Sequence, residues 1–184
     1  MLSQEQVMRA QQLARGEWQR YLIRYGSDTL GGKASYWQGT YKTSIENFVR
    51  RLNEAGIPAR AVRFSYTFYL ILGDEWVQLC DRLDKLIAEI DKVRVDQIQD
   101  LTRRYPAVTK WLSKTKIRSQ LRSLLHRCRG TLEDIGMWNQ RAKEYLLKGD
   151  EEGAKAEFAY AAERVARLEQ EWENLSRQVV MLFL

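Results

Sequence analysis

Apolar residues recur at alternating spacings of three and four along three long stretches of the chain. The stretches are residues 76–93, 117–145 and 154–182, and charged or polar residues fill most of the positions between the apolar ones. This spacing predicts three long α-helices, each with one narrow apolar stripe by which it packs against neighbours at a shallow angle. The breaks at Tyr105-Pro106 and around Gly149 are short, which favours antiparallel neighbours.

The N-terminal part of the chain predicts shorter helices. Residues 4–25 and 43–56 have helical patterns, and the second has Gly56 as a C-terminal stop. Residues 59–72 include FSYTFYLIL, the one run that resembles a strand. We predict a helix there as well, because no second strand is evident for this run to pair with.

Length and composition fit one folded domain with a substantial core, since the chain has 184 residues of which 45% are hydrophobic and 29% charged. The expected fold class is all-α: residues 1–184 form a single antiparallel bundle of three long helices plus shorter N-terminal helices, with a glycine-rich, aromatic and basic loop at residues 26–42. No stretch approaches the roughly 20 apolar residues that cross a bilayer, and no signal-peptide core is evident. We therefore expect a cytoplasmic protein without a membrane partner.

The sequence GSDTLGGKAS in this loop resembles a phosphate-binding P-loop but fails its spacing. The motif needs a glycine, four residues, Gly-Lys and then Ser or Thr. Ser27 stands where the first glycine belongs, and Ala34 replaces the hydroxyl residue that binds Mg²⁺. With a single histidine and two cysteines on apolar helix faces, we expect no metal, no cofactor and no catalytic centre, and hence a non-enzymatic protein.

Positive charge concentrates between residues 101 and 132, where nine Lys and Arg occur without any Asp or Glu. The flanking segments 73–100 and 150–184 each contain eight acidic residues. A helix surface of one sign repels itself, so one explanation is a polyanionic partner. The other is neutralisation by the acidic neighbouring helices.

On a helical wheel, Arg118, Arg122 and Arg129 fall on one flank of the apolar stripe, with Lys114 nearby. Side chains placed in this way can reach one row of phosphates. No motif that reads base edges is present, so sequence-independent contact with the nucleic-acid backbone is expected.

The loop at 26–42 places aromatic rings such as that of Trp37 beside lysines, a combination typical of single-strand binding. The alternative is that these rings fold back onto the core. The candidate nucleic-acid-binding residues are Lys33, Trp37, Lys42, Arg50, Arg51, Arg60, Lys110, Lys114, Arg118, Arg122 and Arg129.

The segment YKTSIENFVRRLNEAGIPARAVRF resembles the small helical subunits of type III CRISPR effector complexes, of the Cmr and Csm kind. Tyr41, Leu52, Gly56, Ile57 and Phe64 occupy positions comparable to those of the family's tyrosine, first helix, glycine turn and second helix. Alanine replaces the usual asparagine of that turn, and the last helix has no counterpart. The resemblance implies a small basic helical protein that stacks in copies along the complex and contacts guide or target RNA.

The predicted function is that of a helical nucleic-acid-binding subunit of a ribonucleoprotein complex. Its expected partners are RNA or single-stranded DNA, other protein subunits and further copies of itself. The alternative is a helical protein–protein adaptor whose basic surface docks an acidic partner. Salt-dependent RNA binding separates the two.

Overall fold

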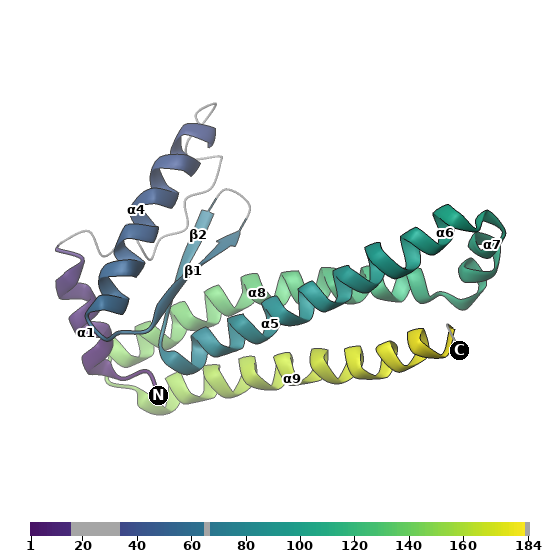
Figure 1. The fold of residues 1–184 in the computed structure, drawn as a ribbon. Coiled ribbons are helices and arrows are strands. Elements are labelled where there is room, and N and C mark those ends of the chain that lie inside the picture. The colour runs from purple at the N-terminus through teal and green to yellow at the C-terminus, as the bar shows by residue number, and fades with distance from the viewer. Residues whose placement is uncertain (16–33, 65–66, 183–184) are drawn as a thin grey trace. The chain divides into compact units, whose positions relative to one another are not determined.

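The computed structural model describes residues 1–15, 34–64 and 67–182, and they are mostly helical, with one small two-stranded sheet (Figure 1). The elements in chain order are α1 (Gln4–Leu13), α4 (Ala34–Glu54), β1 (Ala59–Phe64), β2 (Thr67–Leu72), α5 (Asp74–Lys92), the π-helix η2 (Val93–Gln99), α6 (Asp100–Arg104), α7 (Pro106–Thr115), α8 (Ile117–Leu147) and α9 (Glu151–Leu182). The largely helical class expected from the apolar periodicity is therefore correct. None of the described helices is both long and apolar enough to cross a membrane.

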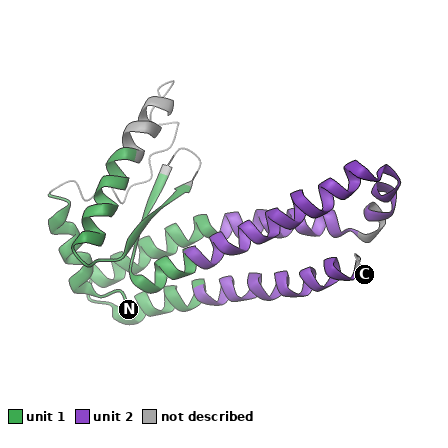
Figure 2. Ribbon diagram, in the orientation of Figure 1, with its two compact units in different colours: residues 1–80, 132–161 green, residues 81–131, 162–184 purple. Residues whose placement is uncertain are grey.

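The chain divides into two compact units (Figure 2). Unit 1 comprises residues 1–80 and 132–161 and contains the hairpin. Unit 2 comprises residues 81–131 and 162–184 and contains η2, α6 and α7.

Two N-terminal helix boundaries differ from the sequence prediction. α1 begins at a capping box, in which Ser3 and Gln6 bond each other's backbone N–H, and it ends at Leu13, where Arg15 takes a positive φ of 52°. A continuous helix over residues 4–25 is therefore wrong, and residues 16–25 lie outside the described part. α4 begins at Ala34 instead of residue 43, so residues 34–42 of the predicted loop are helical.

The segment predicted as a helix at 59–72 is a β-hairpin. β1 and β2 pair antiparallel, with Ala59 opposite Leu72 and Phe64 opposite Thr67. The absence of a partner strand was the reason to predict a helix, but this segment supplies both strands itself. Its β-branched and aromatic residues favour the pleated conformation.

Asparagine side chains close both edges of this hairpin at its base. On one edge, Leu72 N–H donates to Asn139 Oδ1 (3.0 Å), and Asn139 Nδ2 donates to the Leu72 carbonyl (2.9 Å). On the other, Ala59 N–H donates to Asn53 Oδ1 (3.1 Å), and Asn53 Nδ2 donates to the Ala59 carbonyl (3.0 Å). Each amide therefore takes the place of a neighbouring strand and satisfies backbone groups that would otherwise be unpaired.

The face of α8 that meets β2 carries three residues spaced by three and four. Gly136 lies against the Tyr69 ring, Asn139 bonds Leu72, and Lys143 Nζ donates to the Leu70 carbonyl (2.6 Å). Asn139 and Lys143 are fully buried beside the apolar stripe of the same helix. Unit 1 thus buries a polar row in addition to the predicted apolar one.

In unit 2, interhelical contacts join α9 to α5 and to α8. Arg82 of α5 pairs with Glu169, and Trp172 Nε1 donates to Glu89 (3.1 Å). The predicted apolar positions face inward, as the full burial of Leu83 shows. The other buried members of the stripes in this unit include Leu86, Ile90, Leu121, Leu124, Cys128, Val165, Leu168, Leu175 and Val179.

Candidate nucleic-acid interface

The basic stretch 101–132 does not form one helix. α7 ends at Thr115, Lys116 adopts the left-handed conformation (φ 59°), and α8 begins at Ile117. Because the helix is interrupted at Lys116, a single wheel cannot place Lys114 on the flank of the α8 arginines. The wheel that placed Lys114 near that flank therefore does not apply across Lys116, and the side chain of Lys114 lies outside the described part of the chain.

Three arginines of α8 form a row, the α8 arginine row, which consists of Arg118, Arg122 and Arg129. All three are exposed, and offsets of 4 and 11 residues keep them on one side of a helix. None of their side chains forms an ion pair or hydrogen bond within the described part of the chain. Arg127 differs, since its Nη1 lies 2.6 Å from Glu171 Oε2. Neutralisation by a neighbouring helix therefore applies to Arg127 and not to the row.

Two members of the row line a hollow of about 180 Å³ in unit 2. Its lining residues are Arg94, Ile98 and Gln99 of η2 with Arg118, Leu121 and Arg122 of α8. No acidic side chain lines it. The three arginines among its lining residues define it as the arginine hollow.

The π-helix gives the arginine hollow its η2 wall. In a π-helix the backbone hydrogen bonds span five residues, so Ile98 and Gln99 lie over Arg94 in the next turn. The wider turn also shifts the apolar stripe by one residue, from position 97 to position 98. Ile98 is therefore buried, whereas Gln97 is exposed. An apolar floor made by Ile98 and Leu121 therefore lies beneath the guanidinium groups.

Arg94 is held in place by an acidic neighbour one turn earlier. Its Nε and Nη2 donate to Asp91 Oδ1 at 3.1 and 2.9 Å. Its Nη1 has no hydrogen bond to any described residue. Sequence reasoning missed Arg94 because it lies in the acid-rich segment 73–100, and the local charge count concealed it.

The candidate residues of the N-terminal region are placed differently. Lys33 lies outside the described residues, and Trp37 and Lys42 belong to α4, of which only the backbone is described there. Arg50 is exposed on α4. Arg51 donates to the Leu13 carbonyl (3.4 Å) and lies over the Phe48 ring, so its guanidinium contributes to the packing of α1 on α4.

The remaining candidates are Arg60 and the α7 lysines. Arg60 is half-buried in β1 and takes part in an interaction within the fold. Lys110 is exposed on α7 and also interacts with another residue. The structure therefore brings together Arg118 and Arg122 with Arg94, and it does not show these other candidates in the same hollow.

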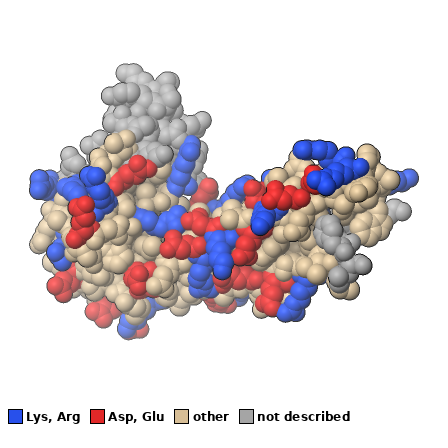
Figure 3. Space-filling view, in the orientation of Figure 1, with Lys and Arg blue, Asp and Glu red and all other residues tan. Residues whose placement is uncertain are grey.

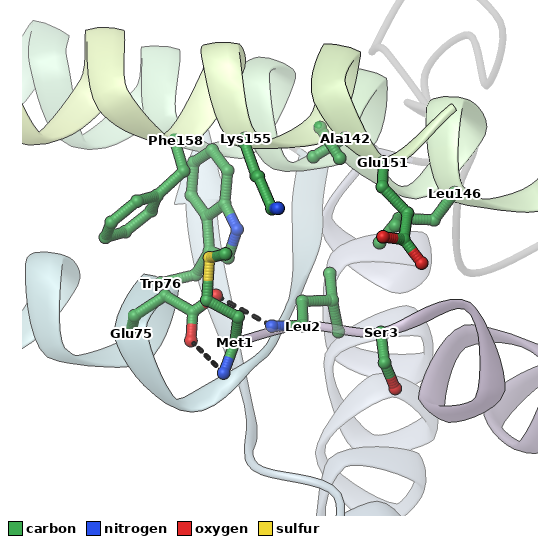
Figure 4. A pocket seen from close by; sticks show the side chains of 11 residues that line it. Met1, Leu2, Ser3, Glu75, Trp76, Ala142, Leu146, Glu151, Lys155 and Phe158 are labelled. Carbon is green, nitrogen blue, oxygen red and sulfur yellow. Dashed lines mark hydrogen bonds and ion pairs between the residues drawn. The ribbon is translucent and has the colours of Figure 1, made fainter. Parts of the chain in front are cut away.

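A second hollow, of about 190 Å³, lies in unit 1 (Figure 4). The edge of the Trp76 ring meets Phe158, with 5.3 Å between ring centroids. Glu75 accepts a hydrogen bond from Leu2 N–H (2.7 Å), which folds the first residues over this hollow. None of the predicted binding residues lines it.

Candidate metal ligands and the two cysteines can be located in the described residues. No group of three or more His, Cys, Asp or Glu among them is arranged to hold a metal ion. Cys80 and Cys128 are buried and are not joined in a disulfide, and their burial agrees with their predicted positions on apolar faces. Burial raises the pKa of the Cys128 thiol to about 11, so it is protonated at neutral pH.

Figure 3 shows blue Lys and Arg side chains gathered over the α6–α7 end of unit 2, whereas red and blue mix over α5 and α9. The mixing agrees with the ion pairs between these helices.

Comparison with family models, curated proteins and solved structures finds no match. The function must therefore be inferred from the charge and geometry of the sites themselves.

Proposed function

We propose that this chain is a non-enzymatic helical subunit that binds RNA or single-stranded DNA through the sugar-phosphate backbone, without sequence specificity. The observation that carries the proposal is the α8 arginine row. Its three guanidinium groups are exposed and have no acidic partner in the described part of the chain. Unpaired cations of one sign on one flank favour a polyanionic ligand.

The spacing of the row suits a series of phosphates. At about 1.5 Å rise per residue, Arg118 and Arg122 are about 6 Å apart along α8, and Arg129 lies about 10 Å further on. Guanidinium groups bind phosphate oxygens in a bidentate manner, so each arginine can hold one phosphate. Such contacts position a strand but do not read its bases.

We further propose that the long helices α5, α8 and α9 form an antiparallel bundle that serves as a subunit of a ribonucleoprotein complex. The resemblance of residues 41–64 to type III CRISPR small subunits is the reason for proposing this class of assembly, although Phe64, matched to the family's second helix, lies in strand β1 of this chain. Exposed apolar side chains in unit 2, including Tyr105, Trp111, Val180 and Met181, favour additional contacts with protein subunits.

The test compares the affinity of the wild type and of the double variant Arg118→Ala/Arg122→Ala for a single-stranded RNA at several salt concentrations. Fluorescence anisotropy gives the dissociation constants. Because each lost phosphate contact removes about one released counterion, the slope of log K against log salt should become shallower by roughly one to two units. Affinity at low salt should fall at least about tenfold.

A matched control removes two other arginines of unit 2. Arg167 and Arg177 pair with Glu163 and Glu173 on the exposed surface of α9, so Arg167→Ala/Arg177→Ala changes the net charge equally. This control should keep nearly the wild-type slope. An unchanged slope in the α8 variant, accompanied by a lower melting temperature, would show that the row serves the fold, and it would contradict the proposal.

A further inference from the structure

We propose that the arginine hollow binds a phosphate monoester, the doubly charged group found at a phosphorylated strand end or on a free mononucleotide. This inference rests on the proposed function in taking a nucleic-acid strand as the ligand. It adds a site for one particular phosphate to the sequence-independent row. Arg94 of η2, which does not belong to the row, makes the difference.

Charge favours a monoester over the diesters of the backbone. A monoester carries about −1.5 to −2 charge at pH 7 and has three strong acceptor oxygens. Three guanidinium groups surround the hollow, and no carboxylate lines it. Because Arg94 is already paired with Asp91, a doubly charged monoester matches the two remaining guanidinium groups, whereas a singly charged diester leaves one of them without a counterpart.

Shape favours a terminal group. The hollow has a volume of about 180 Å³, and its floor consists of Ile98 and Leu121, which are 2% and 0% exposed. A diester phosphate is joined to nucleotides on both sides, so the strand would have to pass into the hollow and out again. A monoester phosphate is joined on one side only, so the strand can end in the hollow. The apolar floor also lowers the local dielectric, which strengthens the attraction between guanidinium and phosphate.

Arg94 is prepared for this role by Asp91. The carboxylate holds Nε and Nη2 of the guanidinium and leaves Nη1 free to donate to a ligand. An arginine held in this way loses little side-chain entropy on binding. Gln99, at the edge of the same turn, adds an amide that can donate to a phosphate oxygen.

The experiment measures the affinity of the full chain for three RNAs of one sequence: one with a 5′-phosphate, one with a 3′-phosphate and one with hydroxyl groups at both ends. We expect at least one phosphorylated RNA to bind roughly tenfold more tightly than the hydroxyl RNA. Arg94→Gln should remove this preference. Arg129→Gln, which alters the row outside the hollow, should weaken all three RNAs equally and preserve the preference.

Protonation of the ligand gives an independent readout. The second pKa of a phosphate monoester is near 6, so the preference should shrink between pH 7 and pH 5 while the hydroxyl RNA changes little. Melting temperatures of Arg94→Gln and Arg129→Gln establish that both variants are folded. A preference that Arg94→Gln leaves intact would overturn the assignment to this hollow.

Competition separates the two sources of the monoester. If AMP or inorganic phosphate abolishes the preference at concentrations near the RNA dissociation constant, the ligand is the free monoester. If the phosphorylated RNA binds far more tightly than AMP, the ligand is the strand end. Equal, salt-dependent affinities for all three RNAs would overturn this inference and leave the proposed function standing, whereas absence of RNA binding would overturn the proposed function.

Discussion

At the scale of single residues, the most unusual side chain is that of Lys143. It is fully buried in unit 1, and its one hydrogen bond in the described structure runs to the Leu70 carbonyl. Burial lowers the pKa of its ammonium group from 10.5 to about 7, because a charged amine is poorly solvated there. The neutral amine retains an N–H to donate to Leu70, so the contact survives deprotonation.

This pKa predicts a pH-dependent stability. Between about pH 7 and pH 10.5 the unfolded chain binds one proton at this lysine that the folded chain does not, so the free energy of unfolding rises with pH. The contribution is about 1.4 kcal/mol per pH unit in this window. Urea denaturation at pH 7, 8 and 9 should show that Lys143→Met loses this part of the slope.

Lys148→Met is the matched control, because Lys148 is exposed just beyond α8. It should retain the wild-type pH dependence. Parallel stability profiles for the wild type and Lys143→Met would show that Lys143 is protonated alike in the folded and unfolded states.

At the scale of elements, α8 contains two glycines in contrasting surroundings. A Cβ added at Gly136 would lie 2.5 Å from the Tyr69 ring of β2, whereas one added at Gly130 would meet nothing within 4 Å. The first glycine lets helix and hairpin approach closely. The second has no such packing role.

Gly136→Ala and Gly130→Ala should therefore have opposite effects on the free energy of unfolding. Gly136→Ala forces the Tyr69 ring or the helix to move and should destabilise the protein by roughly 1–3 kcal/mol. Gly130→Ala only raises helix propensity and should stabilise it by up to about 1 kcal/mol. Urea denaturation of the two variants checks this, and equal effects would contradict the close contact between α8 and β2.

The elements also show what the sequence could predict and what it could not. The long stripes were found because their spacing of three and four depends only on local periodicity, and the breaks at Tyr105-Pro106 and Gly149 were found because proline and glycine end helices. The hairpin was missed because only one strand-like run was evident: its partner β1, with the sequence ARAVRF, contains two arginines and does not stand out as a strand. Periodicity also cannot distinguish the continuous apolar run of β2 from a buried helix.

The candidate site was predictable only in part. The α8 arginines stood out because no acidic residue interrupts their segment, but the left-handed Lys116 that separates them from Lys114 has no strong sequence signal. Arg94 reaches the site because the π-helix η2 shifts the following residues by one position around the helix axis. Composition does not reveal such a shift. Asn139 and Lys143 occupy buried positions because of hydrogen bonds to a distant strand, which local patterns do not show.

At the scale of the whole molecule, a net charge of +6 is less informative than how the charges are paired. In unit 2, acidic side chains of α9 neutralise Arg82 and Arg127. The α8 arginine row keeps its charge free within the described structure. The excess positive charge is therefore available to a ligand at defined positions.

This distribution predicts binding that does not depend on base sequence. Phosphate contacts supply affinity but carry no sequence information. Single-stranded RNAs of equal length and unrelated, unstructured sequence should therefore have dissociation constants within about threefold of one another at a fixed salt concentration, a spread that stacking differences can cause. A preference of a hundredfold for one sequence, measured by anisotropy, would indicate contacts to base edges.

The two asparagines that close the hairpin edges are synthesised at different times, so the two edges close at different stages of folding during translation. Asn53 lies 6 residues from Ala59, so the β1 edge closes as soon as the hairpin has been made. Asn139 lies 67 residues after Leu72, and at roughly 5–20 residues per second a ribosome needs several seconds to reach it. During that interval the β2 edge of each nascent chain is open to strands of neighbouring chains on the same messenger RNA, so slower translation between the two positions should increase misassembly.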